Sequence, residues 1–346
     1  MRSRTSIVSL AILCGILCAG LFVGRAVAAP AEDARKAALI EGAKKEGKVV
    51  WYNMLTVVEA NVVAKKFHEK YPFITAEMYR SGAENMMTKI TAENQAKKYI
   101  FDVLMITAAE SELLRRKGLF AKYLSPERKF FPENLRDAEG YWTDQYLNLN
   151  VIGYNTKLVS RQDLPKTYED LLKPRWKGRM GMDTKAYNWF ASVIKHMGEK
   201  KGLEFMKKLG EQNILFRTGR TLNAQLVGAG EVQLGIAVYN QRIEEMKEKG
   251  APVEWLALEP VVPEIHPLSL SAHAPHPNAA RLFLDYLLSK EGQEVIASFF
   301  RIPSRSDVEP RIPAMRKGFT IMDPDFSMVD QYDRYVKLYR ELLMKK

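Results

Sequence analysis

The chain has 346 residues, of which 47% are hydrophobic and 27% charged, and this balance excludes a collagen-like or intrinsically disordered protein. Its length exceeds what one typical hydrophobic core supports, so we expect two lobes. The net charge of +11 would attract anions, but basic and acidic residues alternate, as over residues 242–249, which is typical of solvated helix surfaces. We therefore expect no nucleic-acid partner.

The first 28 residues have the order of a secretory signal peptide. Arg2 and Arg4 precede an uncharged, apolar run over residues 7–23, and the Ala-Val-Ala sequence at 26–28 supplies a small-residue cleavage site. A membrane anchor is the alternative, but the run is shorter than the roughly 20 residues that a spanning helix needs. We therefore predict a signal peptide at residues 1–28, cleavage after Ala28, and a periplasmic protein.

The two cysteines, Cys14 and Cys18, lie inside this apolar run. Each follows a leucine, whereas lipid attachment favours a small residue at that place, so we disfavour a lipoprotein. Cleavage would remove both thiols, which excludes cysteine nucleophiles, thiolate metal sites and disulfides from the mature chain. It would also remove three arginines and no acidic residue, which lowers the net charge from +11 to +8.

Short apolar runs rich in β-prone residues alternate with amphipathic segments in the first third of the mature chain. Pro72 and Gly118 end two of these segments, as helix-breaking residues do. Such alternation is typical of an α/β protein with a parallel sheet covered by helices on both faces. The pattern predicts strands at residues 48–52, 73–79 and 101–106 and helices at residues 32–45, 57–71, 84–96 and 109–117.

The alternation continues through the rest of the chain. Residues 255–263 are apolar but interrupted by proline, so we predict a connector there and not a central strand. Residues 324–346 are expected to end in a helix. The other predicted elements are strands at 146–154, 179–182 and 232–239 and helices at 168–172, 189–197, 203–210, 219–227, 241–249 and 277–288.

No motif in the sequence indicates an enzyme. A serine-hydrolase elbow, a zinc-protease helix, a phosphate-binding P-loop and a calcium loop are all missing. The Gly-Ala-Gly sequence at 228–230 begins like a dinucleotide fingerprint but lacks its third glycine, so we predict a turn. His266, His273 and His276 lack the one-turn spacing of a helical metal site, so we interpret them as structural or surface residues. We predict no catalytic residues and no bound cofactor.

A series of longer segments matches a known family. They are residues 140–142 (Gly-Tyr-Trp), 150–155 (Asn-Val-Ile-Gly-Tyr-Asn), 164–171 (Leu-Pro-Lys-Thr-Tyr-Glu-Asp-Leu), 174–178 (Pro-Arg-Trp-Lys-Gly) and 288–293 (Leu-Ser-Lys-Glu-Gly-Gln). In this order the chain resembles the family 1 extracellular solute-binding proteins of ABC importers, near their ferric-ion-binding branch.

The resemblance implies the type 2 periplasmic-binding-protein fold: two α/β lobes, each a mixed sheet flanked by helices, joined by two crossing strands. The crossings would fall near residues 146–154 and 255–270. We accordingly divide the mature chain into residues 29–147 (first part of lobe 1), 148–256 (lobe 2) and 257–346 (second part of lobe 1 with the C-terminal helices). We expect a monomer that closes on its ligand by hinge motion and delivers it to an ABC permease in the inner membrane.

The candidate binding residues follow from where such lobes bind ligands. Ligands lie outside the carboxyl ends of the strands, where helix N-termini present free N–H groups. We therefore selected residues that follow a predicted strand or begin a predicted helix. They are Asn53, Arg80, Ser81, Thr107, Thr184, Tyr187, Arg217, Thr218, Gly219, Arg220, Tyr239 and Asn240.

Arginines in this set predict an anionic ligand. Arg80, Arg217 and Arg220, with the helix N-terminus near Gly219, suit an organic carboxylate, a phosphate or a phosphonate. Tyr187 and Tyr239 could pack against the organic part of such a ligand.

Ferric iron is the alternative ligand that the resemblance raises. Ferric-binding relatives hold iron through tyrosinates, and Tyr187 and Tyr239 match two of them. Asn240 stands where those relatives have a second adjacent tyrosine, so iron would need a synergistic anion to complete its ligands. An exported enzyme on the same scaffold and a binding protein that serves a sensor remain alternatives of another class.

Overall fold

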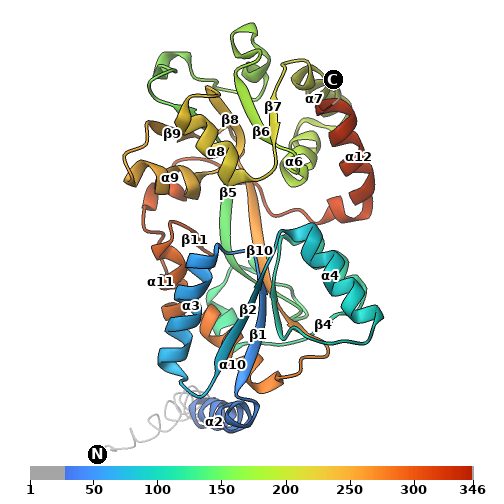
Figure 1. Cartoon of the computed structure of the whole chain (residues 1–346), viewed down its shortest axis with the longest axis vertical. Helices are drawn as coiled ribbons and strands as arrows, with labels where there is room; N and C mark the ends of the chain where they lie inside the picture. Colours follow the sequence, from blue (N-terminus) through green and yellow to red (C-terminus); the bar gives the residue numbers. More distant parts are fainter. Residues whose placement is uncertain (1–27, 345–346) are drawn as a thin grey trace, which may run out of the picture.

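The computed structural model describes residues 28–344, so the predicted signal peptide, apart from Ala28, lies outside the described residues. Two lobes lie one above the other, and two long strands, β5 (Thr143–Asn155) and β10 (Val262–Ser271), run between them (Figure 1). The predicted two-lobed α/β fold with crossing strands is thereby confirmed. None of the helices within residues 28–344 has the length and apolar character that crossing a membrane requires.

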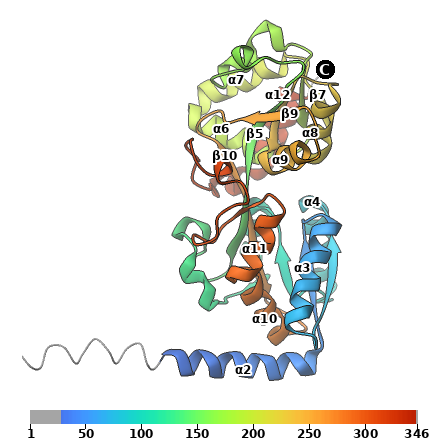
Figure 2. The ribbon, with the colours of Figure 1, turned by 90° about the vertical axis from the view of Figure 1, so that its left-hand side faces the viewer.

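The first lobe is built on three parallel strands. The buried side chains of Val49, Trp51 and Tyr52 make β1 the centre of this group, between β2 and β3. Phe67 on α3 packs against Phe283 on α10, and α2 runs along the base of the lobe (Figure 2). The elements of this lobe are α2 (Ala28–Glu46), β1 (Lys48–Asn53), α3 (Val57–Lys70), β2 (Thr75–Arg80), α4 (Ala83–Gln95), β3 (Val103–Met105), α5 (Ala108–Arg116), β4 (Phe120–Ala121), α10 (Pro277–Leu288), α11 (Lys290–Ser298) and β11 (Ile302–Pro303).

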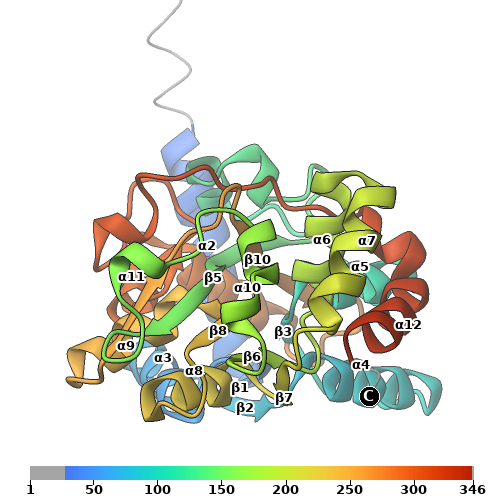
Figure 3. The same ribbon diagram turned by 90° about the horizontal axis from the view of Figure 1, so that it is seen from above.

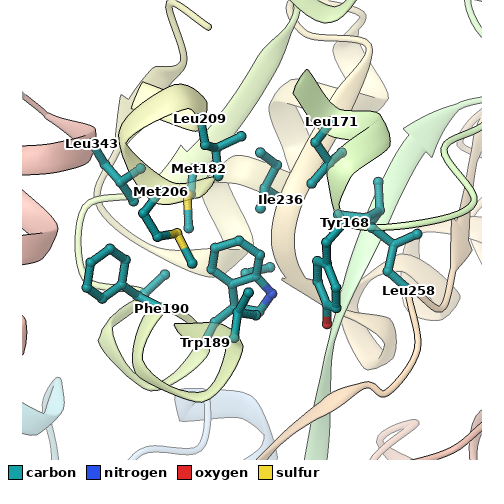
Figure 4. Packing of buried hydrophobic residues seen from close by; sticks show 14 of the residues in the cluster. Tyr168, Leu171, Met182, Trp189, Phe190, Met206, Leu209, Ile236, Leu258 and Leu343 are labelled. Carbon is teal, nitrogen blue, oxygen red and sulfur yellow. The ribbon is translucent and has the colours of Figure 1, made fainter. Parts of the chain in front are cut away.

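The second lobe surrounds a core of large apolar side chains. Trp189 and Phe190 are fully buried there and pack with Met206 and Leu209 (Figure 4). Burial of such side chains stabilises the lobe by about 1.5–3 kcal/mol each relative to exposure. The elements of this lobe are β6 (Met180–Asp183), α6 (Tyr187–Met197), α7 (Glu199–Gly210), β7 (Leu215–Arg217), α8 (Arg220–Ala229), β8 (Leu234–Tyr239), α9 (Asn240–Glu248), β9 (Val253–Leu256) and α12 (Tyr332–Leu343).

One mixed sheet continues through both lobes. Its order is β2-β1-β3-β10-β5-β8-β6-β7, with β4 beside β10, and β9 and β11 beside β5. β1, β2 and β3 are parallel in one lobe, as are β6, β7 and β8 in the other, while β5 and β10 are antiparallel to each other. The carboxyl ends of the parallel strands therefore point toward the space between the lobes, where a ligand is expected to bind.

The prediction of a connector over residues 255–263 was wrong at both of its ends, whereas residues 257–261 do connect two strands. Residues 253–256 form β9, and β10 begins at Val262 and is one of the central strands. At Pro263 the strand pairs with β5 alone, because β3 and β4 pair with β10 only from Leu268 onward. A residue without an N–H group is tolerated where one side of a strand has no partner strand, which is why proline did not prevent this strand.

The division of the C-terminal region also needs a correction. We placed residues 257–346 in lobe 1, but the last helix, α12, packs against α6 and α7 of lobe 2 (Figure 3). Tyr339 is fully buried there, with its ring 5.2 Å from that of Tyr187 and 5.3 Å from that of Phe190. The chain thus passes between the lobes a third time, after β11. The amphipathic pattern of α12 predicts its helical form but does not identify the lobe that covers its apolar side.

Candidate functional site

A cavity of about 610 Å³ lies between the lobes and is lined by residues of both. The first turns of α4 and α5 from lobe 1 and of α6 and α8 from lobe 2 contribute to its wall. The first N–H groups of a helix have no partner inside the helix, and the helix dipole makes this end positive. These helix ends add positive potential to a wall that also contains acidic side chains such as Glu84 and Asp183.

Arg220, the first residue of α8, is a buried cationic group of this site. Its side chain is only 10% exposed, its Nε lies 3.7 Å from Asp183 Oδ2, and its guanidinium group lies 5.2 Å from the ring centre of Tyr239. Burial opposes its charge, but Tyr239 and Asp183 raise the pKa of Arg220 above its usual range, so it stays charged. Its Nη1 is buried and has no hydrogen-bond partner among residues 28–344. A buried cationic donor without a partner is costly, which favours a ligand that accepts from it.

The turn before α8 positions Arg220. Gly219 has a φ of 107°, a conformation that side chains rarely adopt, and its N–H donates to Asp183 Oδ1 at 3.1 Å. Asn223 Nδ2 donates to the carbonyl oxygens of Arg217 and Gly219, at 2.8 and 2.9 Å. The end of β6 and the first turn of α8 are thus held together beneath the guanidinium group.

The lobe 1 side of the cavity contains a buried stack of three side chains. The ring centre of Tyr146 lies 4.2 Å from the guanidinium of Arg301 and 4.2 Å from the ring centre of His266, on which it stacks. Arg301 donates to both carboxylate oxygens of Glu59, at 3.2 and 3.0 Å, so its charge is already balanced. Burial, assisted by the charge of Arg301, lowers the pKa of His266 to about 3, so this ring is neutral at physiological pH.

Two buried carboxyl groups also line the cavity. Glu264 accepts a hydrogen bond from Asn188 Nδ2 at 3.2 Å, and burial raises the pKa of Glu264 to about 7. Glu110 accepts from Thr107 Oγ1 at 2.5 Å and from the Tyr332 hydroxyl at 2.9 Å, and burial raises its pKa as well. Because both acids resist ionisation, they oppose an anionic ligand less than two exposed carboxylates would.

Two contacts join the lobes across the cavity. Lys185, which follows β6 in lobe 2, forms an ion pair with Glu84 in the first turn of α4 in lobe 1. The bond from Tyr332 to Glu110 links the last helix, on lobe 2, to α5 on lobe 1. Both pairs involve groups that line or border the cavity.

The comparisons with known proteins agree with this geometry. A family model described as bacterial extracellular solute-binding protein matches residues 100–326, well over half of the chain. The chain belongs to this family. A further relative, an uncharacterized protein of Haemophilus influenzae, is 26% identical over 265 residues, which cover 73% of this chain and 76% of the relative.

Solved structures resemble this solute-binding protein over most of its length. The periplasmic binding protein AfuA of Actinobacillus pleuropneumoniae, with fructose-6-phosphate bound, has a TM-score of 0.76 and 24% identity, covering 87% of this chain and 99% of AfuA. Iron-bound HitA of Pseudomonas aeruginosa has a TM-score of 0.75 and 23% identity, covering 85% of this chain and 99% of HitA. These likenesses support the fold.

The cavity brings together seven of the twelve residues predicted from the sequence. Two belong to lobe 1 and five to lobe 2, and they come from the ends of strands or the starts of helices, as expected. They are Arg80, Thr107, Tyr187, Thr218, Gly219, Arg220 and Tyr239.

Asn53 and Asn240 of the solute-binding protein do not line the cavity. Asn53 is fully buried and its Oδ1 accepts from the N–H of Leu55 at 3.1 Å. Asn240 is also fully buried, and its Oδ1 accepts from the N–H groups of Leu149 and Gln241. Both amides support the backbone at a strand end, because short polar side chains readily bond to nearby backbone groups.

Ser81, Thr184 and Arg217 also lie outside the cavity wall. Arg217 is exposed, and its Nη1 donates to the carbonyl oxygen of Phe216, next to it in the chain. Thr184 pairs through its hydroxyl with Thr218 at 2.9 Å. Residues at the end of an extended strand alternate in direction, so a position at the correct end can still face away from the ligand.

Several wall residues come from the crossing strands, which the strand-end criterion did not cover. Tyr146 and Asn148 of β5, and Glu264 and His266 of β10, line the cavity, as does Arg301 before β11. The spacing of these residues was a signal in the sequence. Tyr146 and Asn148 are two residues apart, as are Glu264 and His266, so the members of each pair lie on the same face of their strand. Polar groups repeated on one face of an otherwise apolar strand indicate a functional surface.

Proposed function

We propose that this solute-binding protein captures a small organic anion in the cavity between its lobes and delivers it to the permease of an ABC importer. The observation that carries this proposal is Arg220 at the N-terminus of α8, a buried cation whose Nη1 has no hydrogen-bond partner among the described residues, 28–344. The first turns of three further helices add to the favourable potential for an anion. The anionic group of a carboxylate, phosphate or phosphonate would satisfy this donor.

The size of the cavity supports an organic ligand. About 610 Å³ lies within the range of small-molecule sites, and a bare inorganic oxyanion would fill only a small part of it. Tyr187 and Tyr239 provide apolar ring surface beside the cationic group. AfuA, whose solved structure contains fructose-6-phosphate, supports the same ligand class by analogy of fold.

Ferric iron is the second candidate, favoured by the names of relatives. A Serratia marcescens relative is named an Fe(3+)-binding periplasmic protein, and HitA is iron-bound. Iron would require Tyr187 and Tyr239 as tyrosinates together with a synergistic anion. Burial, aided by Glu264, raises the pKa of Tyr239, which opposes the tyrosinate in the absence of a metal. Organic anion capture therefore has the stronger physical support.

The decisive experiment measures anion affinity after substitution of Arg220. Purified mature protein is titrated calorimetrically with glycerol 3-phosphate, methylphosphonate and gluconate. A hydrogen bond to a charged group contributes about 1.5–3 kcal/mol, so Arg220→Met is expected to weaken binding roughly 10- to 100-fold. Arg220→Lys keeps the charge and should retain part of the affinity. Arg217→Met, three residues away and outside the cavity, is the matched control and should bind like the parent.

Two results would replace the proposal. Equal affinities in the parent and Arg220→Met, with the fold intact by circular dichroism, would remove the arginine from the site. Addition of ferric citrate is expected to produce no visible tyrosinate-to-iron absorption band. A band that disappears in Tyr239→Phe would establish the iron-binding alternative.

The partner needs a separate test. We propose an importer because members of this family are extracellular solute-binding proteins. Genes for a permease and an ATPase beside the gene of this chain would support import, whereas a neighbouring membrane sensor would support signalling. Incubation with bound ligand should return it chemically unchanged, and its conversion would indicate an enzyme instead.

A further inference from the structure

The crossing strand β10 presents two buried hydrogen-bond acceptors to the cavity. Glu264 and His266 are two residues apart, so their side chains lie on the same face of the strand, and both line the cavity. They are 5% and 3% exposed, respectively. Because β10 belongs to both lobes, these groups would meet a ligand at the middle of the site.

The hydrogen bonding of His266 determines which of its nitrogens can face a ligand. Its Nδ1 lies 3.3 Å from the backbone oxygen of Tyr146. A carbonyl oxygen can only accept, so Nδ1 carries the proton of this bond. The ring is neutral in its buried setting, with a pKa lowered to about 3 by burial and by Arg301. Nε2 is therefore left without a proton and is an acceptor.

Glu264 is held in place by a neighbouring amide. Asn188 Nδ2 donates to the Pro263 oxygen at 2.9 Å and to Glu264 Oε2 at 3.2 Å, which uses both of its hydrogens. The orientation of the carboxyl group is thus fixed, and its other lone pairs stay available. Asn188 cannot serve as a donor to the ligand while both bonds persist.

We propose that the ligand is a hydroxylated organic anion, whose anionic group binds at Arg220 and whose hydroxyl groups donate to Glu264 and His266. This inference rests on the proposed function and identifies the substrate class of the same site. If the ligand presented an alkyl chain to Glu264 and His266, both acceptors would lose their hydrogen bonds to water and gain none from the ligand. This loss costs about 1–3 kcal/mol for each acceptor. A second anionic group at the same place would meet Nε2 of His266, an acceptor that cannot donate to it. Hydroxyl groups satisfy both acceptors without adding charge.

The test compares anions that differ only in their hydroxyl groups. Calorimetric titration of the mature protein would use three pairs: glycerol 3-phosphate with propyl phosphate, sorbitol 6-phosphate with hexyl phosphate, and gluconate with hexanoate. We expect the hydroxylated member of at least one pair to bind roughly tenfold or more tightly, since a site built to bond a hydroxyl group rejects the analogue that lacks it.

A variant assigns this preference to β10. Glu264→Met removes the acceptor and the buried charge while keeping the side-chain volume close to that of glutamate. The preference for the hydroxylated member should shrink to a few-fold or less, because the variant lacks the acceptor that distinguishes the two members of a pair. Arg217→Met is again the control and should keep the full preference. A melting temperature at or above that of the parent would confirm that Glu264→Met is folded.

The outcomes separate this inference from the proposed function. Binding of the alkyl anions as tightly as the hydroxylated ones would overturn the hydroxyl assignment but leave anion capture intact. A preference that persists unchanged in Glu264→Met would remove this residue from the recognition. Tighter binding of phosphoethanolamine than of hydroxyethyl phosphate would show that the ligand group bound by Glu264 and His266 is an ammonium, and would refute the hydroxyl assignment. Failure of every anion in the panel would refute both proposals.

Discussion

The buried carboxyl group of Glu264 makes the stability of the fold depend on pH. Burial raises its pKa in the folded protein to about 7 from an ordinary value of 4.5, although the nearby charge of Arg220 acts in the opposite direction. The folded state therefore holds the proton of this group more tightly than the unfolded chain does. Its stabilising contribution is complete below about pH 4.5 and is lost as the pH rises toward 7.

The magnitude follows from the difference between the two pKa values. A shift from 4.5 to about 7, at 1.36 kcal/mol for each pKa unit, corresponds to a loss on the order of 3 kcal/mol between pH 4.5 and 7.5. Asp144, whose pKa burial raises to about 8, contributes a change of the same sign. Its effect must be cancelled before that of Glu264 can be measured.

Glu264→Gln provides this cancellation, because the amide is similar in shape and does not titrate. Urea denaturation of the parent and the variant at half-unit intervals from pH 4.5 to 8.5 gives the difference in their unfolding free energies. This difference should move in favour of the variant by about 3 kcal/mol as the pH rises, with its midpoint between the two pKa values. A difference that stays constant over this range would mean that Glu264 titrates normally, and the burial argument would then be wrong.

Two further predictions concern packing between elements. Arg301→Met leaves Glu59 buried without its partner and should lower the free energy of unfolding, measured by urea denaturation, by about 3–5 kcal/mol. Adding Glu59→Gln to the same chain should restore most of this loss. Equal stability of the single and double variants would contradict this reasoning. Gly210→Ala would bring a methyl group against the carbonyl oxygen of Leu342 in α12, so we expect a loss of about 1–3 kcal/mol and earlier proteolysis of the C-terminal helix. The exposed Lys207→Ala on the same helix is its control, and an unchanged melting temperature in Gly210→Ala would show that α12 does not pack there.

Much of the fold was predictable because it follows from local patterns. Helix α10 begins and ends at the predicted residues, since Pro277 suits a first turn and the apolar spacing continues to Leu288. The buried β1 and the helix after it were also predicted within one or two residues. The short strands β4, β7, β9 and β11 were missed, because two to four residues carry too little periodicity to be recognised.

The candidate site was predictable where it depends on the ends of elements. Gly219 and Arg220 lie at a helix start, and the sequence identified them as ligand-binding candidates for that reason. The same criterion selected Asn53 and Asn240, whose side chains turn inward to bond the backbone. Which way a strand-end side chain faces depends on its neighbours in space, and local sequence contains no information about them.

The sequence by itself determined the family, the α/β alternation of elements and the cationic helix start at Arg220. The tertiary structure alone decided that Glu264 and His266 of β10 face the same cavity as Arg220, more than forty residues earlier in the chain. It also decided that α12 belongs with lobe 2. The physical reason is the same in both cases: helix and strand patterns depend on neighbours in sequence, whereas strand pairing and the burial of an apolar face depend on surfaces that only the folded chain brings together.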